Sequence, residues 1–380
     1  AQPDALLRAS EVRFDAGDFD SAQEYARRAI ASAPLDGRAY RELGLIASAR
    51  GDDAGAATMM RLARRHAPRD IPAHGWLMYR DLHAGDYAGA LGHVDFMLRV
   101  DRKLRTRLYA GLIGLANGPA RPSLAALLGG GPPWRAAFWA QLCRDSPDRA
   151  RIAALVDALR DAPVPLDHAE RAAWLERLVR DGRWAQAYPL WIDLLPADQR
   201  GDLADVHDGG FEHPPEDTGF GWRFERIAGA RIDRAATAGV HGRHALHVEF
   251  EDRRVAFHQV SQLLVLAPGH YRLSGRVRAD GLRNERGMQW VIVCVGARSE
   301  RIASTGRYSG SSPWHAFSTD FDVPDAGCAA QWLRLDLAAR IPAEQMAGGG
   351  IWFDDLDIAR ASMPQAATPE SAATAGEGGK

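Results

Sequence analysis

The C-terminal half of the chain is patterned in short runs of alternating hydrophobic and polar residues. In residues 331–337, three leucines alternate with Trp332, Arg334 and Asp336, which places the leucines on one face of a strand and the polar residues on the other. Pro- and Gly-rich turns separate the runs. Seven such strands predict an antiparallel β-sandwich or jelly roll. They are expected at 245–249, 259–266, 271–278, 289–295, 314–321, 331–337 and 351–358.

The N-terminal half carries a helical repeat. A Gly-Asp dipeptide recurs every thirty-four residues, and an alanine follows each glycine by five positions. The dipeptides are Gly17-Asp18, Gly51-Asp52 and Gly85-Asp86, and the alanines are Ala22, Ala56 and Ala90. Glycine ends one helix and lets the chain reverse, while alanine permits a close approach of the next helix. Five or six helical hairpins stacked as a solenoid with a concave groove are predicted.

Length and composition divide the chain into two domains and a tail. With 380 residues, two domains are the natural expectation. Helical periodicity stops near residue 201, so we expect an all-α domain at 1–202, an all-β domain at 203–361 and a disordered, Ala- and Pro-rich tail at 362–380. A formal charge of -2 gives no global attraction to nucleic acid. No apolar run approaches the roughly 20 residues of a membrane span.

The second repeat unit, which includes Tyr40 to Pro68, resembles the tetratricopeptide repeat family. The matching positions are Tyr40, Leu43, Gly44, Gly51, Ala56, Ala63 and Pro68. The resemblance implies that the solenoid binds a protein partner in its groove. Arg61, Arg64 and Arg65 form a cationic cluster on one predicted helix, a pattern that most often marks a solvated face.

The β domain resembles the galactose-binding-like jelly rolls of non-catalytic carbohydrate-binding modules over about residues 206–360. The resemblance is carried by three segments: Asp208-Gly209-Gly210-Phe211-Glu212 with Gly221-Trp222, His241-Gly242-Arg243-His244-Ala245-Leu246, and Trp352-Phe353-Asp354-Asp355-Leu356. It implies a polysaccharide ligand, although this architecture hosts many functions.

Candidate ligand-binding residues follow from strand parity. Trp332, Arg334 and Asp336 offer an aromatic ring beside planar polar groups, and Trp290 joins them if Val291, Val293 and Val295 face the core. By the same alternation, Arg276, Arg278 and Glu249 are expected on the outer faces of their own strands and join the candidates. Together these residues would make an Arg-rich aromatic face for an acidic or highly hydroxylated glycan. The alternative is that they pack against the solenoid or form a salt-bridged outer sheet.

The same resemblance implies a structural calcium ion, with Asp354 on the closing strand and Glu212 and Asp208 near the opening as its acids. By parity Asp354 points toward the core, where a carboxylate needs a partner or a cation. The alternative is a buried, hydrogen-bonded aspartate. His241, His244 and His247 are not expected to hold zinc, since their spacing directs them to different faces.

Cys294 and Cys328 fall in the same domain, and by alternation both would point away from the core. They either form one disulfide or remain free thiols. The start Ala1-Gln2-Pro3-Asp4 fits a mature N-terminus after signal-peptide cleavage, and therefore a periplasmic or cell-surface protein, but a trimmed cytoplasmic chain would begin in the same way.

The sequence therefore predicts a non-catalytic envelope scaffold. Its solenoid would dock a protein and its jelly roll would bind a polysaccharide, with a role in exopolysaccharide assembly or secretion. A purely structural adaptor is the rival. An enzyme is not expected: Glu249 and Asp336 are the one carboxylate pair that could serve glycoside hydrolysis, and they would have to share an open cleft. No phosphate-binding loop, nucleophile elbow or zinc-protease motif is present.

Overall fold

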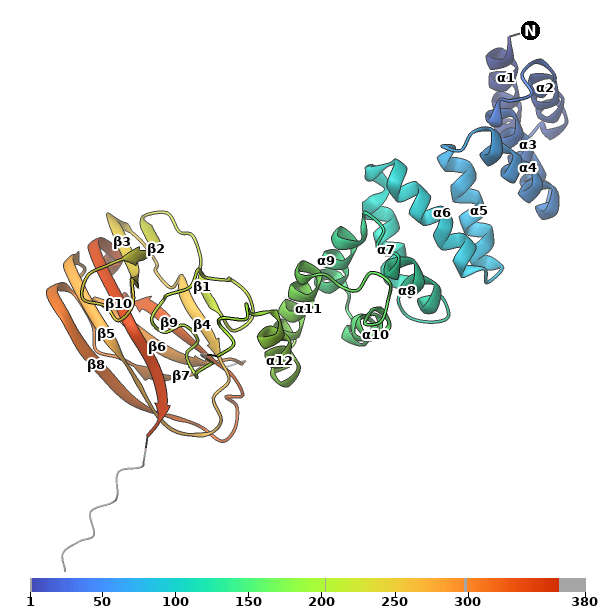
Figure 1. The fold of residues 1–380 in the computed structure, drawn as a ribbon. Coiled ribbons are helices and arrows are strands. Elements are labelled where there is room, and N and C mark those ends of the chain that lie inside the picture. The colour runs from blue at the N-terminus through green and yellow to red at the C-terminus, as the bar shows by residue number, and fades with distance from the viewer. Residues whose placement is uncertain (1, 202, 297–298, 362–380) are drawn as a thin grey trace, which may run out of the picture. The chain divides into compact units, whose positions relative to one another are not determined.

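The computed structural model describes residues 2–201, 203–296 and 299–361 (Figure 1). Helices occupy the N-terminal part and two antiparallel sheets the C-terminal part, which confirms the predicted all-α plus all-β fold class. The predicted disordered tail at 362–380 lies outside the described residues. None of the described helices has the length and apolar composition that a membrane span requires.

The helical part consists of short helices that pair as antiparallel hairpins at its start. In the described residues these are α1 Pro3–Asp15, α2 Phe19–Ser32, α3 Gly37–Ala49, α4 Asp53–His66, α5 Ile71–His83, α6 Tyr87–Val100, the 3₁₀ turn η1 Arg102–Leu104, α7 Arg105–Leu115, α8 Arg121–Gly129, α9 Arg135–Asp145, α10 Arg149–Leu159, α11 His168–Arg180 and α12 Trp184–Leu194. The pairs α1–α2, α3–α4 and α5–α6 each pack together.

Both residues of the recurring Gly-Asp dipeptide have a role in the hairpin turn. Gly17, Gly51 and Gly85 adopt positive φ angles of 78°, 79° and 75°, which cost glycine little. The aspartates that follow are N-caps of α2, α4 and α6, because each carboxylate accepts a hydrogen bond from a backbone N–H three residues later. One dipeptide therefore ends a helix and begins the next.

The repeated alanines belong to the buried sides of α2, α4 and α6. Ala22, Ala56 and Ala90 are fully buried, as expected for positions where a larger side chain would separate the helices. Asp167 and Glu170 form a capping box at the start of α11: the Glu170 N–H donates to Asp167 Oδ1 at 2.8 Å, and the Asp167 N–H donates to Glu170 Oε2 at 3.0 Å.

The C-terminal part is a β-sandwich of two five-stranded sheets among the described residues, with orders β1-β4-β9-β6-β7 and β2-β3-β10-β5-β8. The strands are β1 Trp222–Phe224, β2 Ala230–Ala236, β3 His244–Arg254, β4 Val260–Leu264, β5 Gly269–Arg283, β6 Met288–Cys294, β7 Arg301–Ser304, β8 Gly310–Val323, β9 Gln331–Leu337 and β10 Met346–Arg360, with the 3₁₀ turn η2 Pro342–Gln345 before β10. All seven predicted strands are present. Strands β1, β2 and β7 were not predicted from the sequence.

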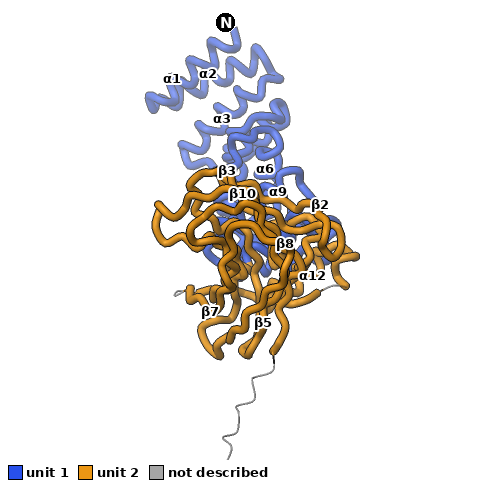
Figure 2. The backbone as a smooth tube through the Cα atoms, turned by 90° about the vertical axis from the view of Figure 1, so that its left-hand side faces the viewer, with its two compact units in different colours: residues 1–177 blue, residues 178–380 orange. Residues whose placement is uncertain are grey.

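The structure divides into two compact units, residues 1–177 and 178–380 (Figure 2). Helix α12 and the end of α11 thus belong to the same unit as the sandwich, while the change from helix to strand falls between α12 and β1.

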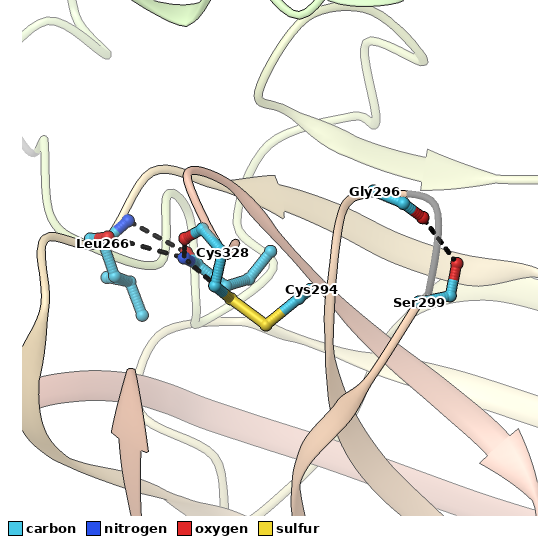
Figure 3. Close-up of a disulfide and its surroundings, with 6 residues drawn as sticks. Leu266, Cys294, Gly296, Ser299 and Cys328 are labelled. Carbon is cyan, nitrogen blue, oxygen red and sulfur yellow. Dashed lines mark hydrogen bonds between the residues drawn. A yellow bond between two sulfur atoms is a disulfide. The ribbon is translucent and has the colours of Figure 1, made fainter. Parts of the chain in front are cut away.

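Cys294 and Cys328 form a disulfide at one end of the sandwich (Figure 3). Both side chains are buried in the hydrophobic core, so the expectation that they point away from it was wrong. Nearby, the Gln331 side-chain amide donates to the Cys328 carbonyl at 2.7 Å and accepts from the Leu266 N–H at 3.0 Å. The disulfide therefore lies in a region already tied together by a buried amide.

Candidate functional site

Trp290 is not a surface residue. Its side chain is 0% exposed and lies between the sheets, with ring centroids 5.7 Å from Trp222 and 5.4 Å from Phe353. Trp290, Ile292 and Cys294 face the core, and the valines of β6 take the opposite parity. The predicted orientation of β6 was therefore reversed, and Trp290 is removed from the candidate binding residues.

Trp332, Arg334 and Asp336 lie on the outer face of the β1-β4-β9-β6-β7 sheet, as their parity predicted. Their polar groups are occupied by one another, because Arg334 Nε and Nη2 donate to the two carboxylate oxygens of Asp336 at 2.6 and 2.9 Å. Asp336 is only 8% exposed. This strand therefore leaves a ligand little unsatisfied hydrogen-bonding capacity.

The outer face of the other sheet carries a row of polar and aromatic side chains across four strands. Strand pairing sets Asp233 of β2 opposite His247 of β3, His247 opposite Trp352 of β10, and Trp352 opposite Arg278 of β5. Their neighbours along the strands, including Val248 on β3, face the core. Alternation therefore directs all four side chains outward.

The middle of this row is a planar stack. The His247 and Trp352 rings are 4.4 Å apart with an interplanar angle of 13°, and the Arg278 guanidinium lies 4.8 Å from the Trp352 ring centre. Asp233 Oδ1 contacts His247 Nδ1 at 3.0 Å and Glu249 Oε2 lies 3.4 Å from His247 Nε2, so acidic groups orient the imidazole on both sides. We call His247, Trp352 and Arg278 the outer-face stack.

A loop forms one wall beside this row. Residues 237–243 connect β2 to β3, and the Trp314 indole of β8 donates to the Ala238 carbonyl at 3.2 Å. The Arg276 guanidinium lies 5.4 Å from the Trp314 ring centre and 3.7 Å from Asp355 Oδ2. Because β2 and β8 are opposite edges of their sheet, the loop and Trp314 together span its outer surface.

A shallow hollow of about 490 Å³ lies on this face. Its lining combines charged, aromatic and small residues, namely Arg231, Asp233, Arg234, Ala235, Ala236, Thr237, Ala238, His247, Arg278 and Trp352. Within the described ranges, no carboxylate lies within ion-pair distance of Arg278. The hollow therefore offers an unpaired guanidinium beside an aromatic edge and an alanine-lined apolar wall.

The predicted binding residues thus separate onto two faces. Arg276, Arg278 and Glu249 belong to the face with the hollow, whereas Trp332, Arg334 and Asp336 lie on the outer face of the opposite sheet. Glu249 and Asp336 consequently cannot share a cleft, which removes the carboxylate pair considered for glycoside hydrolysis. The sequence reading missed Trp352, His247 and Trp314 as site residues, although the alternation of 351–358 already placed Trp352 opposite Ile351 and Phe353.

The three predicted calcium ligands are held mainly by backbone N–H groups. Asp208 accepts from the N–H groups of Glu212 and His213 at 2.8 and 3.0 Å, and Glu212 Oε1 accepts from Arg243 and His244 at 2.8 and 2.9 Å. These two carboxylates are thus engaged. Among the described residues there is no cluster of three or more His, Cys, Asp or Glu side chains suited to a metal ion.

Asp354 differs from the other two acids. It is 0% exposed, as its predicted core-facing position requires, and Oδ2 accepts from the His241 N–H at 3.1 Å. Oδ1 is buried without a hydrogen-bond partner in the described structure. Burial raises the pKa of Asp354 to about 6. A cation near Oδ1 would satisfy this atom, but the Asp208 and Glu212 side chains do not complete a ligand set, so calcium stays a prediction that depends on Asp354.

Comparison with known proteins finds distant likenesses to carbohydrate-binding structures. No family model and no curated protein matches the sequence. A structure described as "CBM4 structure and function" is 16% identical with a TM-score of 0.32, covering 41% of this chain and 99% of its own. The CBM22-1 xylan-binding domain of Paenibacillus barcinonensis Xyn10C is 14% identical with a TM-score of 0.28, covering 40% and 90%. TmCBM61 in complex with β-1,4-galactotriose is 14% identical with a TM-score of 0.29, covering 42% and 100%. Likeness at this distance says nothing of the ligand.

Proposed function

We propose that the β-sandwich is a non-catalytic glycan-binding module whose site is the hollow on the outer face of the β2-β3-β10-β5-β8 sheet. The observation that carries this is the outer-face stack of His247, Trp352 and Arg278, which lines the hollow. Such sites combine apolar surface with a few well-placed polar groups.

The chemistry of the hollow suits an acidic or highly hydroxylated sugar. The indole ring of Trp352 is contacted by His247 and Arg278 from the strands on either side, so it contributes its edge. Sugar C–H groups would pack on that edge and on the alanines, while hydroxyl or carboxylate oxygens would accept from the Arg278 guanidinium, a rigid planar donor. The acids around His247 hold the stack in place.

The helical part supports a scaffolding role in this proposal. Its Gly-Asp hairpins have the spacing of tetratricopeptide repeats, whose resemblance implies a protein partner in the groove. Combined with glycan binding, this arrangement suits an exported protein of the cell envelope that takes part in exopolysaccharide assembly or secretion. A calcium ion beside Asp354 would stabilise the closing strand of the module.

A glycan-array screen of the full chain, followed by titration of the best ligand, tests this function. Arg278→Gln and Trp352→Ala should each reduce affinity at least about tenfold, since each removes a contact to a charged group or an aromatic anchor. Trp332→Ala is the matched control, an indole removed from the opposite outer face, and should bind as wild type. Retained binding in the first two variants with loss in the control would move the site to β9.

If the folded protein binds none of the neutral and acidic glycans on the array, glycan binding is refuted and the structural adaptor is favoured. Running the screen with calcium and with a chelator tests the ion separately. Calcium should raise the Tm of wild type and leave that of Asp354→Asn unchanged. If calcium changes the Tm of neither protein, a structural calcium ion is excluded.

A further inference from the structure

A second hollow lies within the helical part, between α4, α5 and α6. It has a volume of about 450 Å³ and is separate from every residue of the proposed glycan site. Arg61 and Arg64 come from α4, Arg80 and Asp81 from α5, and the remaining lining consists of His74, Leu77, Ala88, Gly89, Gly92, His93 and Phe96. We call it the α4–α6 pocket. Its size falls in the range of about 300–1,000 Å³ typical of ligand sites.

The lining of this pocket is positively charged. Three guanidinium groups face one carboxylate, and Arg80 already pairs with that carboxylate of Asp81. Arg61 hydrogen-bonds only the Thr58 hydroxyl at 3.3 Å, and in the described part of the chain neither Arg61 nor Arg64 has an acidic partner within ion-pair distance. Two cations three residues apart on one helix repel each other mildly, so a counter-charge in the pocket would be stabilising.

The two buried histidines in the pocket cannot neutralise the arginines, because an imidazole is either neutral or positively charged. His74 and His93 contact each other through their Nδ1 atoms at 2.9 Å, and His74 is stacked on Phe96 with ring centroids 4.1 Å apart. Burial, together with the charges of His74, Arg64 and Arg80 and against that of Asp81, lowers the pKa of His93 to about 4. The charges of Arg64 and Arg80 therefore converge on the same buried ring, which is neutral at physiological pH.

We propose that the α4–α6 pocket binds a multiply charged oxyanion, whose carboxylate or phosphate oxygens are recognised by Arg61, Arg64 and Arg80. Guanidinium groups bind such oxygens through parallel hydrogen bonds. Leu77 and Phe96 provide an apolar wall for the carbon skeleton that carries the charges. The oxyanion is either a free small acid or the side chains of an acidic peptide, and both present the same group. The site is independent of glycan binding by the sandwich.

Small residues keep the pocket open and supply a sharp test. An added Cβ at Gly92 would meet nothing within 4 Å, whereas at Gly89 it would collide with the Asp86 carboxylate that caps α6. Gly92→Leu therefore fills the pocket without changing its charge, and it favours the helix by intrinsic propensity. Gly75→Leu is the matched control, since Gly75 on α5 also faces open space but does not line the pocket.

The experiment is isothermal titration calorimetry of the full chain at low ionic strength with inorganic phosphate, citrate and an oligoglutamate peptide. Wild type should show saturable binding at one site. Arg64→Gln should weaken it about tenfold, as expected for loss of a charge-assisted contact, and Gly92→Leu should abolish it. Arg65→Gln, an exposed arginine on the same helix outside the pocket, and Gly75→Leu should bind as wild type.

The three probes distinguish the sources of the oxyanion. Citrate or phosphate binding with this variant pattern identifies a free small acid, and much tighter oligoglutamate binding with the same pattern identifies an acidic peptide. No saturable binding by any probe would overturn the assignment. Equal weakening by Arg65→Gln and Arg64→Gln would do the same, because it would reveal general attraction to a solvated cationic face.

Discussion

The buried ion pair between Arg135 and Glu170 should be the most sensitive polar contact of the helical part. Arg135 is 5% exposed, and its Nε and Nη2 atoms donate to the two oxygens of Glu170, each at 2.8 Å. The other donors reach the backbone carbonyls of Leu128, Val164 and Pro165 at 2.7 to 3.0 Å. One guanidinium therefore joins α9 to α11 and to the segment that precedes α11.

Removing either partner should destabilise the helical part by about 3–5 kcal/mol, because the remaining charge is buried without compensation. Arg135→Met leaves the Glu170 carboxylate unpaired along with three carbonyls. Glu170→Met leaves the guanidinium unpaired and also removes the acceptor of the Asp167 N–H in the capping box, a further cost of about 1 kcal/mol. The double variant buries no unpaired charge, so it should cost at least about 2 kcal/mol less than the sum of the single variants.

Urea unfolding followed by far-ultraviolet circular dichroism measures these differences, because helices dominate that signal. The reasoning would be refuted by single variants that each cost less than about 1 kcal/mol, which is the range of exposed pairs. Strict additivity in the double variant would refute it as well. The exposed pair Arg160–Asp157, with a distance of 2.8 Å, is the matched control and should cost less than about 1 kcal/mol when broken.

Three further outcomes follow from the structure. Gly51→Ala should lower stability by about 1 kcal/mol, because alanine disfavours the positive φ that the hairpin requires, whereas Gly75→Ala within α5 should raise it by a similar amount, both measured by urea unfolding. The pKa of His93 is about 4 in the folded chain against 6.5 as its ordinary value, so the unfolded chain binds more protons between these pH values. The free energy of unfolding therefore keeps its full contribution from neutral His93 above pH 6.5 and falls by up to about 3 kcal/mol as the pH approaches 4. His93→Gln should reduce this dependence of stability on pH, measured by thermal unfolding. Reduction of the Cys294–Cys328 disulfide, which closes a loop of 34 residues, should destabilise the sandwich by about 3–4 kcal/mol in urea with and without reductant.

The helical repeat was predictable because its signals are local. Gly51 ends a hairpin helix through its own backbone conformation, and Ala56 is small and fully buried, so each residue's role can be inferred from its type and spacing. The capping role of Asp52 is equally local, since its carboxylate accepts from the Gly55 N–H at 2.8 Å. This role was not predicted, although aspartate is among the residues most favoured at a helix N-cap.

The faces of the β-strands were predictable only where one parity is polar. On β9 the alternation of leucines with Trp332 and Arg334 gave the correct orientation. On β6 both sets of alternate residues are apolar, so the alternation does not show whether Trp290 or Val291 faces the core. Packing against Trp222 and Phe353, which are distant in sequence, decides that question.

The outer-face stack depends on a residue with no side chain, so the pattern of side-chain types along the strands does not predict it. A Cβ on Gly350 would lie 2.8 Å from Cη2 of Trp352 and 2.7 Å from Oε2 of Glu249. Only glycine therefore leaves space for the indole to lie along β10, level with His247 on β3 and Arg278 on β5. Strand alternation can place three side chains on one face. Whether they stack depends here on the absence of a side chain at Gly350. The proposed glycan site therefore depends on strand register and on the absence of a side chain at Gly350.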